Sequence, residues 1–316
     1  MNTTRYGTAT STNGQQPTND LEMGSIDFYP NGKLQSMFLH RKATKLICKT
    51  TEVAQVAHLC MIASPTIRCS AANVSRTMVT MNKDRVVIDP HELEAIFEQK
   101  RSLRSKIRKA LKNMDPIQRS QEDNAIQNIV LESSWFKASK SLSAYISSPA
   151  LREVDTSRII SEVLSSPANE RKKLYVPRVE DRKSNMKMLM ISSVNDLIEK
   201  SMNILEPALV DSDGNEREDA MQASDPVDLF ILPGLAFDKS GSRLGRSGGY
   251  YDLFLKSYQE LTKERRWKQP LLVALSYSVQ IIGEGPIPVT PFDIPVDALV
   301  SPTGFTAISS AALRCD

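Results

Sequence analysis

The sequence predicts an α/β fold of three layers, α-β-α, with a mostly parallel sheet, preceded by a disordered N-terminal extension. Short apolar runs alternate with segments of helical spacing between residues 89 and 302, as in parallel sheets that helices cover on both faces. The first 27 residues are rich in Thr, Asn, Gln, Ser and Gly without periodicity, which is typical of disorder. A glycine-rich loop lies between an apolar run and a helix, which is where ligands bind in such sheets.

The predicted extension, residues 1–88, has the composition of a targeting segment. Between Phe28 and Lys83 there are eight Lys or Arg and one acidic residue, Glu52, among frequent Ser, Thr and Ala. This composition is typical of an organelle transit peptide, although the first 27 residues carry three acids. We therefore expect a mitochondrial protein, with plastid or cytoplasm as alternatives. A tail without function is the competing interpretation.

Two capped helices open the single folded domain, residues 89–302. Asp89-Pro90 and Asp115-Pro116 each place an N-capping acid before a proline at the first helical position. Apolar spacing carries the first helix to Met114 and the second to about Glu132. The first helix is also basic, through Lys100, Arg101, Arg104, Lys106, Arg108, Lys109 and Lys112. Such a face is usually solvated, or binds nucleic acid without sequence preference.

The remaining elements follow from shorter signals. Strands are expected at residues 142–146, 173–178, 187–191, 228–232, 271–277 and 298–301. Helices are expected from the N-cap Thr156 to Leu164 and over residues 249–264. We expect residues 207–226, which are acidic and turn-rich, to form an exposed loop, and residues 303–316 to form a C-terminal tail.

The distribution of His and Cys limits the possible chemistry. From Glu92 to Arg314 the chain contains neither residue, so a catalytic core there excludes cysteine nucleophiles, Ser-His triads and His-ligated zinc. Arg, Lys, Tyr, carboxylates and an oxygen-bound metal remain, and these suit phosphoryl transfer. The net charge of +3 is too small for a general polyanion binder, and no apolar run approaches the ~18 residues of a membrane span.

Residues 228–252 read DLFILPGLAFDKSGSRLGRSGGYYD and predict a phosphate site. Five of the 13 glycines fall in this segment, and glycine lets the backbone approach a ligand closely. The N–H groups at a helix start favour anions, and the forked guanidinium groups of Arg243 and Arg246 suit phosphate. The segment is neither a Walker motif nor G-x-G-x-x-G. A surface turn is the alternative for the glycines alone.

The order of residues 233–252 resembles the signature of the 5-formyltetrahydrofolate cyclo-ligase family, also called methenyltetrahydrofolate synthetases, which is close to PGLxFDxxGxRLGRGxGYYD. The chain differs at Ser247, where glycine is usual, and a positive φ there would strain the loop. Weaker matches are residues 175–178, 274–280 and 295–297. The resemblance spans roughly residues 100–300.

The resemblance implies ATP- and Mg²⁺-dependent conversion of 5-formyltetrahydrofolate to 5,10-methenyltetrahydrofolate, with release of ADP and phosphate. The implied catalytic residues are Arg243 and Arg246. The implied ATP-binding residues are Lys100, Arg101, Ser102, Leu103 and Arg104, with Arg243, Leu244, Gly245, Arg246, Ser247, Gly248, Gly249, Tyr250 and Tyr251. The implied substrate-binding residues are Asp155, from an E-x-E-T-like element, with Arg246, Ser247, Gly248, Gly249 and Tyr250.

The two implied magnesium ligands are Asp252 and Asp297. Without the resemblance, Asp252 simply favours the first turn of its helix, and Asp155 simply precedes a helix cap. The implied partners are 5-formyltetrahydrofolate and ATP, without nucleic acid or membrane, and we expect a monomer.

Two rival functions remain at this point. A non-catalytic relative would bind nucleotide or RNA through the basic helix at residues 100–112, but it would predict a damaged phosphate loop. A sugar-phosphate isomerase on a similar sheet would need no nucleotide, so the basic pair Lys100 and Arg104 argues against it.

Overall fold

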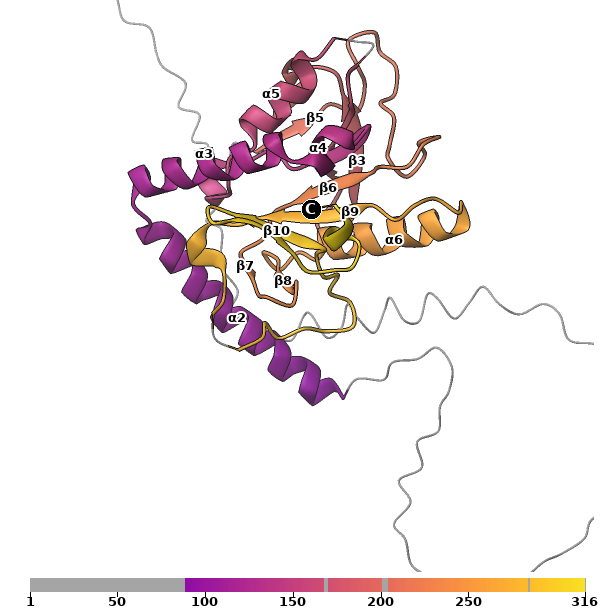
Figure 1. Ribbon diagram of the computed structural model, residues 1–316. Helices are drawn as coiled ribbons and strands as arrows, with labels where there is room; N and C mark the ends of the chain where they lie inside the picture. Colours follow the sequence, from indigo (N-terminus) through magenta and orange to yellow (C-terminus); the bar gives the residue numbers. More distant parts are fainter. Residues whose placement is uncertain (1–88, 168–169, 201–203, 284, 316) are drawn as a thin grey trace, which may run out of the picture. The chain divides into compact units, whose positions relative to one another are not determined.

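The computed structural model describes residues 89–167, 170–200, 204–283 and 285–315 (Figure 1). The predicted disorder and transit function of residues 1–88 therefore lie outside the described residues. Within the described part of the chain, no helix is both long and apolar enough to cross a membrane.

The centre of the fold is a seven-stranded sheet of order β11-β10-β9-β6-β1-β2-β3. The strands are β1 (Ser141–Ala144), β2 (Lys173–Val179), β3 (Met186–Ile191), β6 (Leu229–Leu232), β9 (Leu271–Leu275), β10 (Ala298–Ser301) and β11 (Gly304–Ala307). The five inner strands pair in parallel, and only the edge strands β3 and β11 are antiparallel to their neighbours. The predicted mostly parallel sheet is thus confirmed.

Alternate residues of β6 face two different apolar layers, which explains its uninterrupted apolar sequence. Leu229 and Ile231 pack in one core with residues of α2 (Pro90–Asn113), α3 (Pro116–Glu132) and α5 (Ser157–Ser165). Phe230 and Leu232 pack in the second core with residues of α6 (Tyr250–Glu264). Figure 1 shows α3 and α5 on one side of the sheet and α6 on the other, so the three predicted layers are confirmed.

The two predicted proline-containing helix starts are both observed. Asp89 Oδ1 accepts a hydrogen bond from His91 N at 2.9 Å, and Asp115 Oδ1 accepts from Ile117 N at 2.8 Å. After α3, the short helix α4 (Ser134–Ala138) begins at Ser133, whose Oγ accepts from Phe136 N.

The capping side chain of α5 is that of Asp155 and not that of the predicted Thr156. Thr156 occupies the N-cap position, but its side chain makes no capping bond, because its Oγ1 donates to Tyr145 O at 2.8 Å. Asp155 supplies the cap instead, since its Oδ1 accepts from Ser157 N at 3.1 Å.

The short strands are the elements that the sequence prediction lacks. They are β4 (Leu197–Glu199) with β5 (Leu205–Pro207), β7 (Ala236–Phe237) with β8 (Arg243–Leu244), and β11. The 3-10 turns are η2 (Pro149–Leu151), η3 (Val194–Asp196), η5 (Ser278–Gln280) and η6 (Ala312–Arg314). Residues 303–316 are therefore not a simple tail: Val300 of β10 pairs with Phe305 of β11, and Ala312 is fully buried.

Candidate active site

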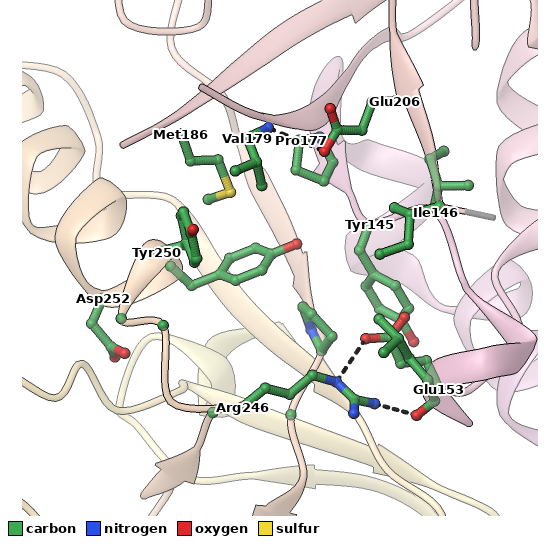
Figure 2. Close-up of a pocket in the computed structure, with 18 of the residues that line it drawn as sticks. Tyr145, Ile146, Glu153, Pro177, Val179, Met186, Glu206, Arg246, Tyr250 and Asp252 are labelled. Carbon is green, nitrogen blue, oxygen red and sulfur yellow. Dashed lines mark hydrogen bonds and ion pairs between the residues drawn. The ribbon is translucent and has the colours of Figure 1, made fainter. Parts of the chain in front are cut away.

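An open, mainly apolar pocket lies beside the carboxyl ends of β1 and β6 (Figure 2). Its volume is about 210 Å³. Its apolar lining residues are Tyr145, Ile146, Leu151, Pro177, Val179, Met186, Ile204, Leu205, Pro233, Tyr250 and Tyr251. Its charged lining residues are Glu153, Glu206, Arg243, Arg246 and Asp252, and Gly234, Gly245, Gly248 and Gly249 complete the wall. An apolar slot with a few convergent charged groups is the usual form of a small-molecule site.

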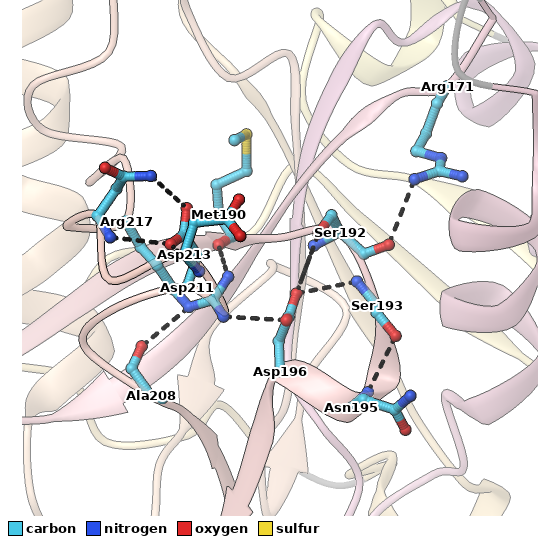
Figure 3. Close-up of polar contacts among 11 residues, drawn as sticks. Arg171, Met190, Ser192, Ser193, Asn195, Asp196, Ala208, Asp211, Asp213 and Arg217 are labelled. Atoms are coloured by element: carbon cyan, nitrogen blue, oxygen red, sulfur yellow. Dashed lines mark hydrogen bonds and ion pairs between the residues drawn. The ribbon is translucent and has the colours of Figure 1, made fainter.

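Residues 204–206, at the start of β5 (Leu205–Pro207), line one side of the pocket, and the buried side chain of Arg217 holds the loop that follows β5. Arg217 donates to Ala208 O at 3.0 Å and to Met190 O at 3.3 Å, and it pairs with Asp196 at 3.0 Å (Figure 3). Together these contacts join the loop after β5 to the end of β3 and to η3. The acidic segment at 207–226 is therefore anchored near its middle.

The predicted phosphate loop connects β8 to α6 and has two residues with positive φ. Gly249 has φ +67°, and Ser247 has φ +99°. Ser247 thus meets the condition under which strain was expected, since glycine tolerates a positive φ better than serine. At Gly248, an added Cβ would lie 2.4 Å from the ring of Tyr250, so a side chain there requires the ring to move.

Arg246 points from this loop into the pocket, where it meets a buried acid. Its Nε lies 3.2 Å from Glu153 Oε1, and its Nη2 donates to Leu151 O (Figure 2). The other Glu153 oxygen, Oε2, accepts from Ser148 N at 3.2 Å. The Arg246–Glu153 ion pair therefore lies at the inner end of the apolar slot.

Burial dominates the electrostatics of this pair. Burial raises the pKa of the Glu153 carboxyl above its ordinary value, and the charge of Arg246 only partly opposes the change. Burial likewise lowers the pKa of the Arg246 guanidinium, and Glu153 partly opposes that change. An ion pair that is desolvated to this degree is costly when one partner is absent.

Glu153, which the sequence analysis did not select, takes the place in the pocket that was expected for Asp155. The Asp155 carboxylate accepts from Ser147 Oγ at 2.9 Å and from Ser157 Oγ at 2.7 Å, and it does not line the pocket. These bonds lower the pKa of Asp155 against the opposing effect of burial, which is the largest single cause. Both acids belong to the same E-x-E-T-like element, and of the two only Glu153 lines the pocket.

Arg243 and Asp252 form a second buried pair in the pocket wall. Arg243 Nη2 lies 2.9 Å from Asp252 Oδ1, which also accepts from Ile294 N at 3.1 Å. Arg243 Nη1 donates to Pro233 O at 3.3 Å, while the buried Nε has no hydrogen-bond partner in the described part of the chain. A buried donor without a hydrogen-bond partner is uncommon. The Arg243 guanidinium also lies over the Tyr251 ring, with its central carbon 5.6 Å from the ring centroid.

The basic helix α2 contacts the phosphate loop from outside the pocket. Arg104 Nε donates to Gly245 O at 2.8 Å, and one turn earlier Lys100 Nζ lies 2.7 Å from Asp293 Oδ1. Lys100 is 4% exposed, so this part of the basic face is turned inward. Of the predicted Lys100–Arg104 pair, Arg104 therefore contacts the glycine loop, and Lys100 instead pairs with Asp293.

The other predicted ATP-binding residues differ in exposure. Arg101 pairs with Glu98 at the surface, Ser102 is exposed, and Leu103 packs partly against the core. Leu244 is buried in the core and Ser247 is exposed beside the pocket. None of these five lines the pocket.

The two predicted magnesium ligands, Asp252 and Asp297, each accept hydrogen bonds from protein groups. Asp297 Oδ2 accepts from Leu272 N at 2.9 Å, at the amino end of β9, and Asp297 does not line the pocket. Asp252 is occupied by Arg243 and Ile294 N. Among the described residues, no group of three or more His, Cys, Asp or Glu side chains could hold a metal ion. Asp293, four residues before the predicted Asp297, is the acid that pairs with Lys100 of α2.

Comparison with known proteins agrees with this geometry. The model of the 5-formyltetrahydrofolate cyclo-ligase family matches residues 96–302. The mitochondrial 5-formyltetrahydrofolate cyclo-ligase of Arabidopsis thaliana is 57% identical over 249 residues, which cover 78% of this chain and 88% of that protein. The 5-formyltetrahydrofolate cyclo-ligase of Mus musculus is 30% identical over 207 residues, which cover 64% of this chain and 92% of that protein.

A solved structure shows the same fold. The NMR structure of 5,10-methenyltetrahydrofolate synthetase from Aquifex aeolicus superposes with a TM-score of 0.52 at 30% sequence identity, covering 67% of this chain and 93% of that one. The family model extends from α2, which contacts the phosphate loop, to the end of β10, and so includes every pocket residue described above. The chain belongs to the 5-formyltetrahydrofolate cyclo-ligase family, and it is a ligase.

Proposed function

We propose that this chain converts 5-formyltetrahydrofolate and MgATP to 5,10-methenyltetrahydrofolate, ADP and phosphate. The observation that carries the proposal is the position of Arg246. Its backbone belongs to the glycine loop, and its guanidinium reaches the acid at the inner end of the apolar slot. One residue can therefore contact both a phosphoryl group and a folate.

The chemistry requires activation of a poor electrophile. The formyl oxygen attacks the γ-phosphorus of ATP, and the bond from that phosphorus to ADP breaks. N10 of the folate then attacks the formyl carbon, phosphate leaves with the formyl oxygen, and N10 loses its proton. Neither step needs a histidine or cysteine, and the chain has none from Glu92 to Arg314.

The residues of the loop are suited to the first step. Arg243 and Arg246 supply fixed positive charge, and the backbone N–H groups between Gly245 and Gly249 supply donors for phosphate oxygens. Arg104 approaches this loop from α2, and Lys100 lies one turn earlier on the same helix, where further phosphates of the nucleotide would extend. Magnesium arrives with ATP as part of the co-substrate, and Asp252 is the pocket acid closest to Arg243.

The apolar slot is suited to the folate. Tyr145, Tyr250 and Tyr251 provide aromatic surface for the pterin ring, and Glu153 provides an acceptor for its ring N–H groups. Glu153 is buried, so its carboxylate is already largely removed from water in the free protein. A ligand N–H group that bonds to this carboxylate therefore displaces little water from it, which favours a ligand with complementary N–H groups.

An absorbance assay tests the proposed reaction. Purified protein is mixed with 5-formyltetrahydrofolate, with and without MgATP, and the absorbance of methenyltetrahydrofolate is followed. We expect product only when MgATP is present, with one ADP per product. Product formation at the same rate without nucleotide would contradict the proposal, as would nucleotide hydrolysis without product.

We also propose that the protein acts in mitochondria, as the name of the Arabidopsis relative suggests for that protein. A fluorescent reporter carrying residues 1–88 at its N-terminus should colocalise with a mitochondrial dye. A reporter signal in plastids or in the cytoplasm would contradict this localisation.

A further inference from the structure

The backbone that carries Glu153 is held by four polar side chains, which come from the end of β1, from α3 and from the segment after β9. Tyr145 Oη, at the end of β1, donates to Val154 O at 2.7 Å. Asp123 Oδ1, on α3, accepts from Asp155 N at 2.8 Å. Arg119, also on α3, donates from Nη2 to Glu153 O at 3.4 Å. Three consecutive residues of this loop are thus fixed through their main chain.

Tyr277, which follows β9, is the centre of this network. Its hydroxyl lies 2.6 Å from Asp123 Oδ1 and 3.0 Å from Glu153 O, and it accepts from Arg119 Nε at 3.1 Å. The Tyr277 side chain is fully buried, and the Arg119 guanidinium lies over its ring at 5.8 Å. The hydroxyl therefore contacts α3 and the Glu153 loop at the same point.

Of the four side chains that hold the Glu153 backbone, only Tyr145 lines the pocket. Tyr277, Asp123 and Arg119 do not line it, whereas the Glu153 carboxylate does (Figure 2). A charged group of this kind must be positioned closely to be useful, because a displacement of about 1 Å removes much of the strength of a directed contact. Glu153 has little freedom to adjust, since Arg246 and Ser148 N hold its two oxygens.

We propose that Tyr277 and Asp123 are positioning residues for Glu153, and that they set the affinity of the pocket for the folate without touching it. This inference rests on the proposed function, because it takes the folate as the ligand that Glu153 meets. Arg119 belongs to the same network through its contacts with both Tyr277 and Glu153 O. Among the described residues, Arg104 and Gly245, on the nucleotide side of the glycine loop, make no hydrogen bond with Tyr277, Asp123 or Arg119.

The surroundings of Asp123 and Tyr277 also determine their protonation. Burial raises the pKa of the Asp123 carboxyl, while Asp155 N, Tyr277 and Arg119 oppose the change. Burial and the bond to Asp123 together raise the pKa of the Tyr277 hydroxyl, so it keeps its proton. The hydroxyl therefore remains a donor to Asp123 at physiological pH.

The test is a double-mutant cycle on the full chain. Tyr277→Phe removes only the hydroxyl, and Tyr258→Phe is the matched control, because Tyr258 is equally buried and its hydroxyl accepts from Val227 N at 2.7 Å in the other core. Dissociation constants are measured by calorimetry for 5-formyltetrahydrofolate and for MgATP, for each variant alone and combined with Glu153→Gln.

We expect Tyr277→Phe to weaken folate binding roughly tenfold, the upper range for one lost hydrogen bond, and to leave MgATP binding within about twofold. In the Glu153→Gln background the same substitution should change folate binding by less than about twofold, because its effect acts through the carboxylate. Tyr258→Phe should leave both constants unchanged in either background. Asp123→Asn is the second variant and should behave like Tyr277→Phe.

Three outcomes would overturn the inference: an unchanged folate constant in Tyr277→Phe, equal weakening of both ligands, or an equal effect of Tyr277→Phe with and without Glu153→Gln. Failure of the proposed function would give a different result from failure of this inference. In that case the unmodified protein binds the folate but forms no methenyltetrahydrofolate, and the cycle still decides the role of Tyr277. Absence of folate binding by the unmodified protein would contradict both.

Discussion

Arg246 joins the two halves of the site, because its backbone lies in the glycine loop and its guanidinium lies against Glu153. Its selection from the sequence rested on the order of residues in the loop, which fixes the backbone locally. Its partner was missed, because Glu153 and Asp155 are two residues apart in one element. Sequence does not show which of them turns into the pocket and which caps α5.

The first residue-scale prediction separates the roles of this pair. Arg246→Ala should lower turnover by roughly 10³–10⁵, as for an arginine that contacts a transferring phosphoryl group. It should also lower the free energy of unfolding by about 1–3 kcal/mol, because Glu153 stays buried without its partner. The double variant Arg246→Ala/Glu153→Gln should recover most of that stability and none of the turnover. Urea unfolding and the absorbance assay measure the two quantities, and recovery of turnover in the double variant would show that Arg246 serves only to balance Glu153.

Ser247 gives the second residue-scale prediction. Its φ of +99° is unfavourable for any residue with a Cβ, so Ser247→Gly should raise the free energy of unfolding by about 1 kcal/mol. Ser247→Ala is the control, because it keeps the Cβ and should bring no gain. Thermal unfolding of the three proteins measures the difference, and equal stability of the Gly and Ala variants would contradict a strained loop.

At the scale of elements, the long helices and inner strands were predicted and the shortest strands were not. Asp-Pro starts and apolar runs are local signals, and they place α2, α3, β6 and β9 closely. The paired strands β7 and β8 have two residues each, too few for any periodicity. Strand β11 adds an antiparallel edge that only its pairing with β10 defines.

The hairpin between β2 and β3 gives the element-scale prediction. Ser184 Oγ donates to Gly248 O, and Tyr250 Oη donates to Asp181 O at 2.9 Å, so the hairpin is fastened to the glycine loop. The same hairpin supplies Val179 and Met186 to the apolar wall. Ser184→Ala should therefore raise KM for both the folate and ATP by roughly two- to tenfold, the loss expected for one hydrogen bond.

The control for this variant is Ser192→Ala at the other end of β3, where the hydroxyl bonds to Asp196 Oδ2 and is remote from the loop. It should leave both constants unchanged. If Ser184→Ala and Ser192→Ala had the same KM values, the hairpin would not be coupled to the loop.

At the scale of the whole molecule, the alternating elements of the sequence predicted the layers. The glycine loop that the sequence singled out lines the pocket. The sequence could not predict the contacts of distant segments. Lys100 and Asp293 form an ion pair although 193 positions separate them in the sequence. Tyr277, which follows β9, contacts Glu153 O although 124 positions separate the two residues. Such contacts depend on the packed sheet, and no local pattern in the sequence records them.

Two truncations give the whole-molecule prediction. Deletion of residues 1–88 should leave activity unchanged, because the first capped helix begins at Pro90 and the pocket is formed by later residues. Deletion of residues 303–316 should lower the free energy of unfolding by several kcal/mol, because it removes β11 and the buried Ala312. Activity assays and urea unfolding measure these effects. Loss of activity in the first truncation, or full stability in the second, would contradict a folded domain that begins near Asp89 and includes β11 and Ala312.

The central claim is that ATP activates the formyl oxygen, and the fate of that atom tests it most directly. 5-Formyltetrahydrofolate labelled with heavy oxygen on the formyl group is converted with unlabelled MgATP, and phosphate, ADP and water are analysed by mass spectrometry. The account predicts one labelled oxygen in each phosphate released, with ADP and bulk water unlabelled. Label in bulk water, with unlabelled phosphate, would contradict it.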